Sequence, residues 1–494
     1  MELFKHQREA IDFILARGGS GAIFHEMGLG KTRTALEIFS KLGIDHMLVV
    51  APISLLRAAW MEDAQKFHPE IKINNMSERG IPEKWFHPTG DHPQYIWLIN
   101  YELLRVREKQ VRQFIRSTCS HWLCVLDESS KIKNYKSAIT KTLINMSGLF
   151  GYRLVMTGTP APNTELEYWP QMQFAEPDCL GTSMTVFRAH FFHLLNRYTK
   201  QVMPAIFTSQ RQAAETFRKC DYAITVEKRE ELMSFIRPIA HMAKKKDCLD
   251  LPDQVDEVRE VDMAPDQARA YQTMKNALVL EIQNQTIAAP VALTKLIKLR
   301  QITSGFVYNA NGEAFEVSQS GGNPEQLIEC VPATMGEQFT NPKIDELFEL
   351  IEESGNQQII IWINFHWEQI KVCHELFKKF GPESVVTLSS LTKDKEESII
   401  AFQSGRARFL VAHPASAAHG LTFVNCSLQV FFSLNYSLEQ YEQAKARTHR
   451  AGQVNKCTYV HLIAKNTIDR DILDVLREKG DMQKIVYEYM KKNS

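Results

Sequence analysis

The chain has 494 residues, which is too long for a single hydrophobic core and predicts two or three domains. Apolar residues make up 44% and charged residues 23%, as in ordinary globular proteins. Lys plus Arg and Asp plus Glu both number 58, which excludes an overall basic field, so any contact with nucleic acid must come from a local groove.

A helix and then a phosphate-binding loop are predicted near the start. The helix covers about residues 5–16, and the loop is Met27-Gly28-Leu29-Gly30-Lys31-Thr32. Glycine lets backbone N–H groups wrap closely around a triphosphate. Lys31 would then reach the β- and γ-phosphates, and Thr32 would offer its hydroxyl to Mg²⁺. The alternative is a glycine-rich turn, because His25 stands where the longer loop pattern has glycine.

Four apolar segments of strand length follow, at 47–52, 95–99, 122–126 and 153–156. Helical patterns separate them, which predicts a parallel sheet covered on both faces, with ligands at the carboxyl ends of its strands. Asp127 and Glu128 come directly after the third segment. Asp127 can hold Mg²⁺ there, and Glu128 can orient and deprotonate an attacking water. An isolated Asp-Glu pair is more often a surface turn, but its place after an apolar strand favours catalysis.

The strand pattern fades from about residue 165 to 320 and then returns. Further strands are predicted at 358–365, 384–388, 407–411, 429–434 and 457–463, and a helix at 366–380. We therefore predict an α/β fold of two similar parallel-sheet lobes with helical insertions. The first lobe covers 1–250 with an insertion at about 165–250. Residues 251–340 form a linker and the insertion of the second lobe, which covers 341–494.

A basic segment, Gln443 to Gln453, stands out in the second lobe. Arg447 and Arg450 are three residues apart, which places them on one face of a predicted helix. From an opposing lobe they could reach a γ-phosphate and stabilise its charge during hydrolysis. The alternative is an ordinary basic helix.

Together, these motifs resemble the Swi/Snf-type ATPases of helicase superfamily two, whose lobes are RecA-like domains of the P-loop NTPase fold. The resemblance covers nearly the whole chain, and its segments occur in the expected order: Phe4–Gln7, Glu26–Thr32, Ala51-Pro52, Asn100–Leu104, Asp127–Asn134, Thr157–Pro160, Leu299–Gln301, Asn341–Lys343, His419–Thr422, Gln443–Gln453 and Thr467–Asp469. It implies that Gln7 reads the adenine base. The chain differs from the family's usual residues at Ser130 (His), His25 (Asp) and Pro162 (Gln), which bears on coupling more than on hydrolysis.

The resemblance implies an enzyme that uses ATP and Mg²⁺ to move along double-stranded DNA, with hydrolysis stimulated by DNA. A role in DNA repair, recombination or the remodelling of protein–DNA complexes would follow. Two alternatives stay open: a helicase that separates the strands of DNA or RNA, and a nucleotide-gated scaffold with weak hydrolysis, which Ser130 favours. A protein partner that directs the motor is compatible with each, and the sequence leaves the oligomeric state open.

The location expected for the chain is the cytoplasm, or the host cytoplasm if a phage encodes it. The nine cysteines are scattered without a C-x-x-C pair, which argues against a disulfide framework or a zinc site. The first residues do not form a signal peptide, and the longest apolar runs are strand-sized, so no membrane span is expected.

Overall fold

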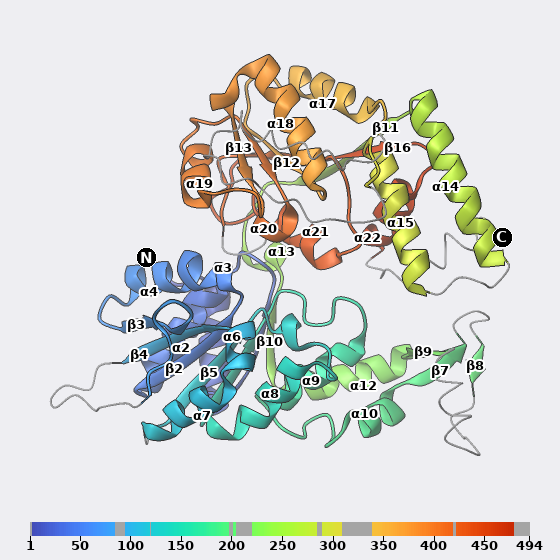
Figure 1. Ribbon diagram of the computed structural model, residues 1–494. Coiled ribbons are helices and arrows are strands. Elements are labelled where there is room, and N and C mark those ends of the chain that lie inside the picture. Colours follow the sequence, from blue (N-terminus) through green and yellow to red (C-terminus); the bar gives the residue numbers. More distant parts are fainter. Residues whose placement is uncertain are drawn as a thin grey trace. The chain divides into compact units, whose positions relative to one another are not determined.

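The computed structural model describes residues 2–83, 94–118, 120–196, 201–203, 220–283, 289–308, 338–417 and 421–478. It contains two units, Met1–Leu249 and Asp250–Ser494. Each unit has its own central parallel β-sheet, with helices packed against it (Figure 1).

The first unit is organised by a seven-stranded sheet of order β10-β1-β6-β5-β2-β4-β3. All neighbouring strands in it are parallel, so their carboxyl ends meet at one edge. The strands are β1 (Gly21–His25), β2 (His46–Ala51), β3 (Lys72–Asn75), β4 (Tyr95–Asn100), β5 (Trp122–Asp127), β6 (Tyr152–Met156) and β10 (Ala240–Ala243).

Helices cover both faces of this sheet because alternate strand residues point to opposite sides. One apolar cluster joins Met47 and Val49 of β2 to the N-terminal helices. These are α1 (Lys5–Ala16), α2 (Lys31–Leu42), α3 (Ile53–Leu55), the π-helical turn η1 (Leu56–Met61) and α4 (Glu62–Phe67). The other cluster joins Leu48 and Val50 to the later helices.

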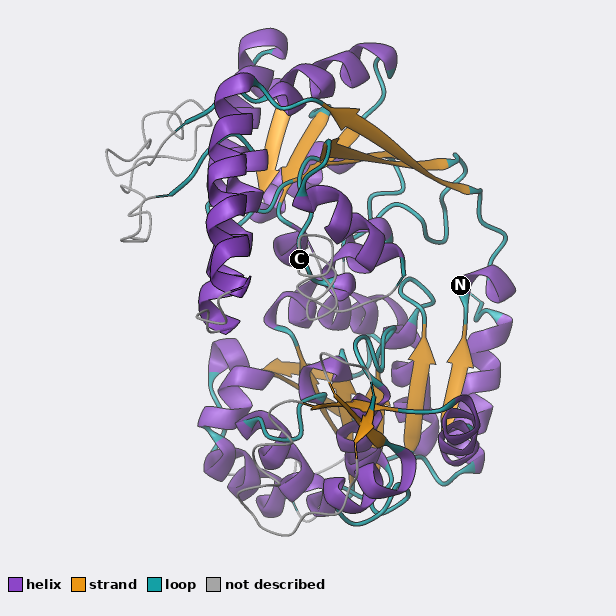
Figure 2. Cartoon of the chain, turned by 90° about the vertical axis from the view of Figure 1, so that its right-hand side faces the viewer, coloured by secondary structure: helices purple, strands orange, loops and turns teal. Residues whose placement is uncertain are grey.

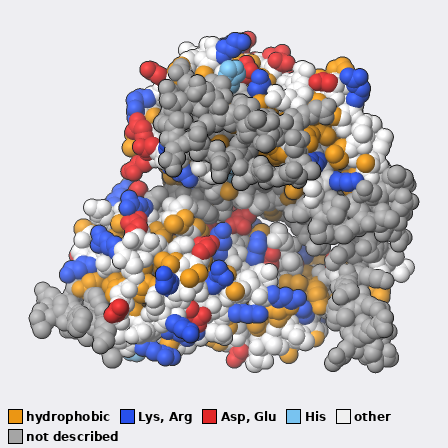
Figure 3. Space-filling view, in the orientation of Figure 1, with side chains coloured by type: hydrophobic (Ala, Val, Ile, Leu, Met, Phe, Trp, Pro, Cys, Tyr) orange, Lys and Arg blue, Asp and Glu red, His pale blue; other side chains and the backbone are white. Residues whose placement is uncertain are grey.

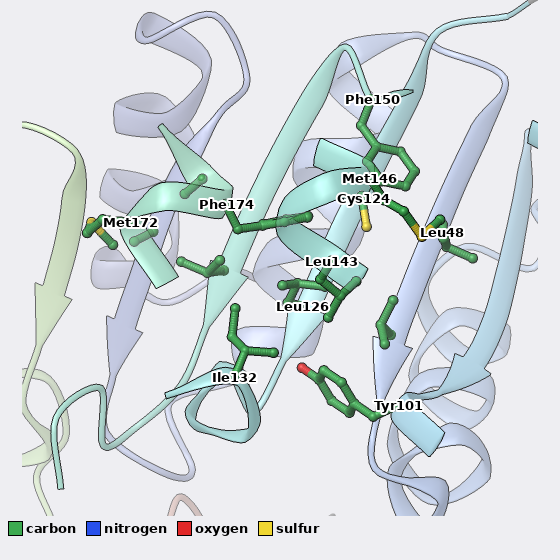
Figure 4. Packing of buried hydrophobic residues seen from close by; sticks show 14 of the residues in the cluster. Leu48, Tyr101, Cys124, Leu126, Ile132, Leu143, Met146, Phe150, Met172 and Phe174 are labelled. Carbon is green, nitrogen blue, oxygen red and sulfur yellow. The ribbon is translucent and has the colours of Figure 1, made fainter. Parts of the chain in front are cut away.

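The later helices of the first unit are short and lie on the second face of the sheet. Figure 4 shows Leu143 and Met146 of one of them packed near Cys124 and Leu126 of β5. The set comprises α5 (Met76–Arg79), α6 (Tyr101–Val106), α7 (Glu108–Ser117), η2 (Ser129–Ile132), α8 (Ala138–Met146), η3 (Ser147–Leu149), η4 (Glu165–Glu167), α9 (Tyr168–Ala175), α10 (Met184–Phe191) and α12 (Val226–Ile236). A short helix, α13 (Lys245–Cys248), follows β10 and has no buried residue.

The range 165–250, expected to be a helical insertion, also contains strands. A small antiparallel sheet has the order β8-β7-β9, with β7 (His193–Asn196), β8 (Val202–Met203) and β9 (Cys220–Ala223). β10 then returns to the main sheet and pairs with β1 at its edge. β10 has four residues, Ala-His-Met-Ala, which is too short and too weakly apolar to give a strand pattern.

The second unit has a six-stranded sheet of order β11-β16-β15-β12-β14-β13, and its neighbouring strands are all parallel. The strands are β11 (Gln254–Val261), β12 (Ile359–Trp362), β13 (Val385–Leu388), β14 (Phe409–Ala412), β15 (Leu428–Phe431) and β16 (Cys457–Ala464). β11 lies within the range 251–340 that was expected to be linker and insertion. Its residues are exposed or half-buried except Val261, and four of the eight are charged, so a prediction based on apolar runs misses this edge strand.

Two apolar clusters again separate the faces of this sheet. The helices are α14 (Pro265–Gln283), α15 (Ala289–Thr303), α17 (Pro342–Glu353), α18 (His366–Phe380), η5 (Pro382–Ser384), α19 (Lys395–Gln403), α20 (Pro414–Ala417), α21 (Leu438–Lys445) and α22 (Ile468–Arg477). Ile359 and Ile361 pack with α17 and α18, whereas Ile360 and Trp362 pack with α14, α15 and α22. Figure 2 shows the helices and strands of both units by colour.

The α/β fold of two parallel-sheet lobes is therefore confirmed. The predicted helices at 5–16 and 366–380 are α1 and α18, and every predicted strand is present within a few residues of its expected bounds. No helix among the described residues is long and apolar enough to cross a lipid bilayer.

Candidate active site

The predicted phosphate loop connects β1 to α2 at the carboxyl edge of the first sheet. Gly28 and Gly30 have φ values of 88° and 71°, in the region where only glycine is unstrained. Gly30 is also the N-cap of α2, so the free N–H groups of the first helical turn point toward the loop. Lys31 begins the helix, and its Nζ donates to the carbonyl oxygen of His25 at 3.1 Å. The backbone thus has the form of an anion-binding loop.

Gln7 is buried on α1 and contacts this loop. Its Nε2 donates to the carbonyl oxygen of Gly30 at 3.2 Å, and its Oε1 accepts from the backbone N–H of Phe4 at 2.9 Å. A Cβ atom on Gly30 would lie 2.3 Å from Gln7 Nε2. Position 30 therefore needs glycine because of its positive φ, and a larger residue there would also displace the Gln7 amide from the loop. The structure brings Gln7 and Met27–Thr32 together.

Asp127 and Glu128 lie at the end of β5, on the same edge of the sheet. Asp127 Oδ1 accepts from the backbone N–H of Glu128 at 3.0 Å, and Oδ2 accepts from the indole Nε1 of Trp60 at 2.8 Å. Burial raises the pKa of the Asp127 carboxyl, while the charge of Lys31 and the hydrogen bonds from Trp60 and from the backbone N–H of Glu128 oppose that rise. Asp127 and Lys31 are therefore electrostatic neighbours.

Glu128 is held in an uncommon backbone conformation, with φ 51° and ψ 55°. A non-glycine residue in this left-handed region costs free energy, and such strain clusters at functional sites. Its side chain is buried, and Oε2 accepts from Thr157 Oγ1 at 3.4 Å. The turn therefore directs the carboxylate of Glu128 toward the loop that follows β6.

Two further contacts tie the loops after β5 and β6 together. Ser129 Oγ donates to Gln171 Oε1 at 2.7 Å, and Gln171 Nε2 donates to the carbonyl oxygens of Pro160 and Glu167 at 2.5 and 2.9 Å. Gly158 lies against the phosphate loop, because a Cβ there would be 3.0 Å from Met27 Cγ. The phosphate loop, the Asp-Glu turn and the segment Thr157–Pro160 thus form one packed unit.

His25 ends β1 beneath this site and is fully buried. Its Nε2 is 2.8 Å from Nδ1 of His241 on β10, so one ring donates and the other accepts. Burial, followed by the influence of His241, Lys31 and His6, lowers the pKa of His25 to about 2. The pair is therefore neutral at physiological pH and fastens β10 to the strand that carries the phosphate loop.

The residues present fit a Mg²⁺ ion that arrives with the nucleotide. Across the described ranges, no group of three or more His, Cys, Asp or Glu side chains is placed to hold a metal. Nucleotide-bound Mg²⁺ needs only one or two protein ligands, because phosphates and waters supply the others. Each carboxylate oxygen of Asp127 accepts one hydrogen bond, from Trp60 or from the backbone N–H of Glu128, and keeps a further lone pair, and Thr32 offers a hydroxyl. Both are the hard oxygen donors that Mg²⁺ prefers.

The placement of Arg447 and Arg450 on one helix face is wrong. α21 ends at Lys445, and both arginines lie in the turns that follow it. They converge all the same, since Arg447 Nη1 and Arg450 Nη1 donate to the carbonyl oxygen of Leu421 at 3.0 and 3.2 Å. Arg447 Nε also donates to the carbonyl oxygen of Gln443 at 2.9 Å. The turns after α21 therefore direct both guanidinium groups to the same carbonyl oxygen, although the two residues do not share a helix face.

Several other residues that the sequence analysis named lie in the second unit. Lys343 and Asp469 form a buried ion pair with Nζ 2.6 Å from Oδ2, so both belong to the core of the second unit. Arg300 is buried between the rings of Phe365 and Tyr436. His419 and Gly420 lie outside the described residues.

Sequence reasoning did not identify Trp60 or Gln171 as neighbours of the site. Each stands in an apolar helical stretch, where a polar group is expected to serve the core. The helical pattern places the indole N–H of Trp60 and the side-chain amide of Gln171 at buried positions. A buried polar group needs a hydrogen-bond partner, and that need was the sequence feature that could have identified them.

Two family models match the sequence. A model of the SNF2-related domain matches residues 6–305, more than half of the chain, and one of the helicase conserved C-terminal domain matches residues 342–452. The first model spans the phosphate loop and Asp127-Glu128, and the second spans Arg447 and Arg450.

Similar proteins come from phage, bacteria, archaea and eukaryotes. Protein p41 of Acyrthosiphon pisum secondary endosymbiont phage 1 is 23% identical over 484 residues, covering 94% of both chains. An uncharacterized ATP-dependent helicase of Mycoplasma pneumoniae is 25% identical and is matched by 97% of this chain, which spans 42% of that protein. The SWI2/SNF2 ATPase core of Sulfolobus solfataricus in complex with dsDNA has 21% identity and a TM-score of 0.41, over all of this chain and 93% of that one.

Proposed function

This chain belongs to the SNF2-related family and is a helicase-like ATPase, and on that premise we propose that it is an ATP-driven motor that moves along double-stranded DNA without separating its strands. The observation that supports this best is the packed unit of phosphate loop, Asp-Glu turn and Thr157–Pro160 in the first lobe. Thr157 and Gln171 connect Glu128 and Ser129 to the loop after β6 by hydrogen bonds, so we expect a change at the Asp-Glu turn to reach that loop.

In the proposed reaction, Lys31 and the N–H groups of Gly28–Thr32 bind the phosphates of ATP, and Gln7 lies beside the adenine. Asp127 and Thr32 would hold Mg²⁺, which supplies positive charge to the phosphates when bound. Glu128 orients the attacking water and accepts its proton. Arg447 and Arg450 come from the second lobe and stabilise the phosphate charge in the transition state.

The proposed DNA contact is a local groove rather than an overall charge effect. The chain has equal numbers of basic and acidic residues. On the face drawn in Figure 3, Lys and Arg side chains are interspersed with Asp and Glu. Binding through phosphates would then have low sequence specificity and high sensitivity to salt.

Triplex displacement tests the proposal. A radiolabelled third strand bound to a linear duplex should be released in an ATP-dependent way, while the duplex itself stays paired. Glu128→Gln is the control, because it removes the base and keeps a similar shape, so it should bind ATP and release no third strand.

The alternatives give different results in the same assay. Efficient separation of a forked duplex without third-strand release would identify a strand-separating helicase. ATP binding without DNA-stimulated phosphate release would identify a nucleotide-gated scaffold. Either result would contradict the proposed motor.

A further inference from the structure

Trp60 is buried at the end of the first sheet and donates to the proposed Mg²⁺ ligand. Its side chain has no exposed surface, and Nε1 lies 2.8 Å from Asp127 Oδ2. A buried indole N–H needs an acceptor, and here the acceptor is a carboxyl oxygen of Asp127. The sequence separation of 67 residues shows that the fold, not local structure, brings the two together.

The turn that carries Trp60 is unusual. η1 (Leu56–Met61) is a π-helix between α3 and α4. A π-turn holds an extra residue, so it rotates the side chains after it by about 100° relative to a regular α-helix. Such turns occur mostly as single bulges and are frequent at functional sites. Here the wide turn accompanies an indole N–H that points to the carboxyl end of β5.

A second contact reaches Asp127 from the opposite face of the sheet. Tyr101, at the start of α6, donates its hydroxyl to the backbone carbonyl oxygen of Asp127 at 2.8 Å. Trp60 packs in the cluster with α1 and α2, whereas Tyr101 packs in the cluster with α8 and α9 (Figure 4). Asp127 is thus fixed from both faces, at its carboxylate and at its backbone.

The remaining contact of the carboxylate completes its orientation. Oδ1 accepts from the backbone N–H of Glu128, and Oδ2 accepts from Trp60, so both oxygens are held and the plane of the group is set. Mg²⁺ demands near-ideal octahedral geometry, so a ligand fixed in advance binds it better than one that rotates.

We propose that Trp60 and Tyr101 are positioning residues that orient Asp127 for Mg²⁺, with the indole N–H of Trp60 as the main contributor. The inference rests on the proposed role of Asp127 as a Mg²⁺ ligand. Neither residue touches the nucleotide in this proposal, so their loss should weaken the response to Mg²⁺ and spare binding of the nucleotide alone.

The test measures the affinity of a fluorescent, non-hydrolysable ATP analogue across a Mg²⁺ titration and in EDTA. Trp60→Phe keeps a smaller aromatic ring and removes the N–H, and it should raise the half-saturating Mg²⁺ concentration by about tenfold, the lower end for residues that orient metal ligands. Affinity in EDTA should stay within about twofold, because the phosphate loop is intact. Tyr101→Phe, which removes one oxygen atom, should give a smaller shift in the same direction.

A matched control is available on the same strand as Asp127. Trp122 is also buried, and its indole Nε1 donates to Thr118 Oγ1 at 2.7 Å, away from Asp127. Trp122→Phe should leave the Mg²⁺ titration unchanged. If Trp60→Phe and Tyr101→Phe both behave like Trp122→Phe, the positioning role is wrong.

One more variant separates this inference from the site assignment. Asp127→Asn should abolish most of the Mg²⁺ response if Asp127 is a ligand. A wild-type response in Asp127→Asn would overturn the ligand assignment and the inference with it. If Asp127→Asn loses the Mg²⁺ response while Trp60→Phe and Tyr101→Phe both keep the wild-type response, the inference is wrong and the ligand assignment stands.

Discussion

At the scale of single residues, we expect substitution of either arginine of the second lobe to slow ATP hydrolysis without weakening ATP binding. Arg447→Ala or Arg450→Ala should leave ATP affinity within a few-fold of wild type, because the ground-state contacts proposed here come from the first lobe. Hydrolysis should fall by roughly 10²–10⁴, somewhat less than for a lone arginine finger, since one arginine can partly cover for the other. Lysine should not rescue fully because it lacks the planar guanidinium fork. Single-turnover hydrolysis beside nucleotide affinity measures both effects.

Lys445 provides the control for the arginine substitutions, because it lies in the same segment and pairs with an acidic side chain of its own unit. Lys445 forms an ion pair with Asp256, with Nζ 2.9 Å from Oδ2. Lys445→Ala should therefore hydrolyse ATP at close to the wild-type rate. Wild-type turnover in both arginine variants would show that these side chains only cap the Leu421 carbonyl within their own lobe.

The lowered pKa of His25 predicts that the folded chain loses stability as the pH falls. Its pKa is about 2 in the folded chain, because of burial and then His241, Lys31 and His6, against 6.5 for an unperturbed histidine. Between these values the unfolded state binds a proton that the folded state does not, so stability is lost as pH falls below about 6.5. The slope from this one group is at most about 1.4 kcal/mol per pH unit.

Thermal melts of the wild type and His25→Asn at pH 7.5 and 5.5 test this expectation. The variant should lose less melting temperature on acidification than the wild type does. His190 is the control, because it is half exposed and lies 2.7 Å from Glu231 Oε1. His190→Asn should retain the wild-type pH dependence, and an unchanged dependence in His25→Asn would contradict the assignment.

Much of the candidate site was predictable at this scale, because phosphate binding demands particular residues. Gly28, Gly30 and Lys31 stand in a motif whose backbone geometry follows from glycine. Trp60 was not predictable, because its role depends on a π-turn and on a partner far away in sequence. The turns at Arg447 were missed because a sequence pattern places a helix end only to within a few residues.

At the scale of elements, one buried ion pair joins α17 to α22 in the second lobe. Lys343 Nζ lies 2.6 Å from Asp469 Oδ2, with side-chain exposures of 1% and 6%. Asp469 also accepts from Thr303 Oγ1 of α15 and from the backbone N–H of Ala464. Lys343→Met leaves a buried carboxylate without its cation and should lower the free energy of unfolding by about 3–5 kcal/mol.

Urea unfolding followed by fluorescence measures that loss. The matched control is Lys465, whose Nζ is 2.7 Å from Asp262 Oδ2, with side-chain exposures of 40% and 80%. Solvent screens such a pair, so Lys465→Met should leave the unfolding midpoint nearly unchanged. Equal effects of the two substitutions would show that Lys343 does not join these helices.

The elements also show where sequence patterns reach their limit. β2, β5 and β12 are central strands buried on both faces, and their continuous apolar runs predict them well. β10 and β11 are edge strands with polar or short sequences, so only the pairing with β1 and β16 defines them. Edge strands carry charges that discourage aggregation, and those charges remove the apolar signal.

At the scale of the whole molecule, the division of labour between lobes can be tested by truncation. The first unit ends at Leu249, and β10 within it completes the sheet beside β1. A fragment ending at Asp250 keeps β10, both apolar clusters and every residue of the proposed phosphate, water and Mg²⁺ contacts. It should therefore fold and bind ATP weakly.

Hydrolysis by this fragment should be absent even with duplex DNA, because Arg447 and Arg450 belong to the second unit and, in the proposed mechanism, act on the transition state. Fluorescent ATP binding and phosphate release, measured on the fragment and on its Lys31→Ala variant, separate the two functions. Binding should distinguish these two proteins, whereas their phosphate release should be equal and at background. A fragment that ends at Pro238 loses β10 and leaves the edge of β1 unpaired, so it should melt at a lower temperature. Near-normal DNA-stimulated turnover by the Asp250 fragment would show that one lobe holds the complete catalytic site, and the proposed action of the arginines across lobes would be wrong.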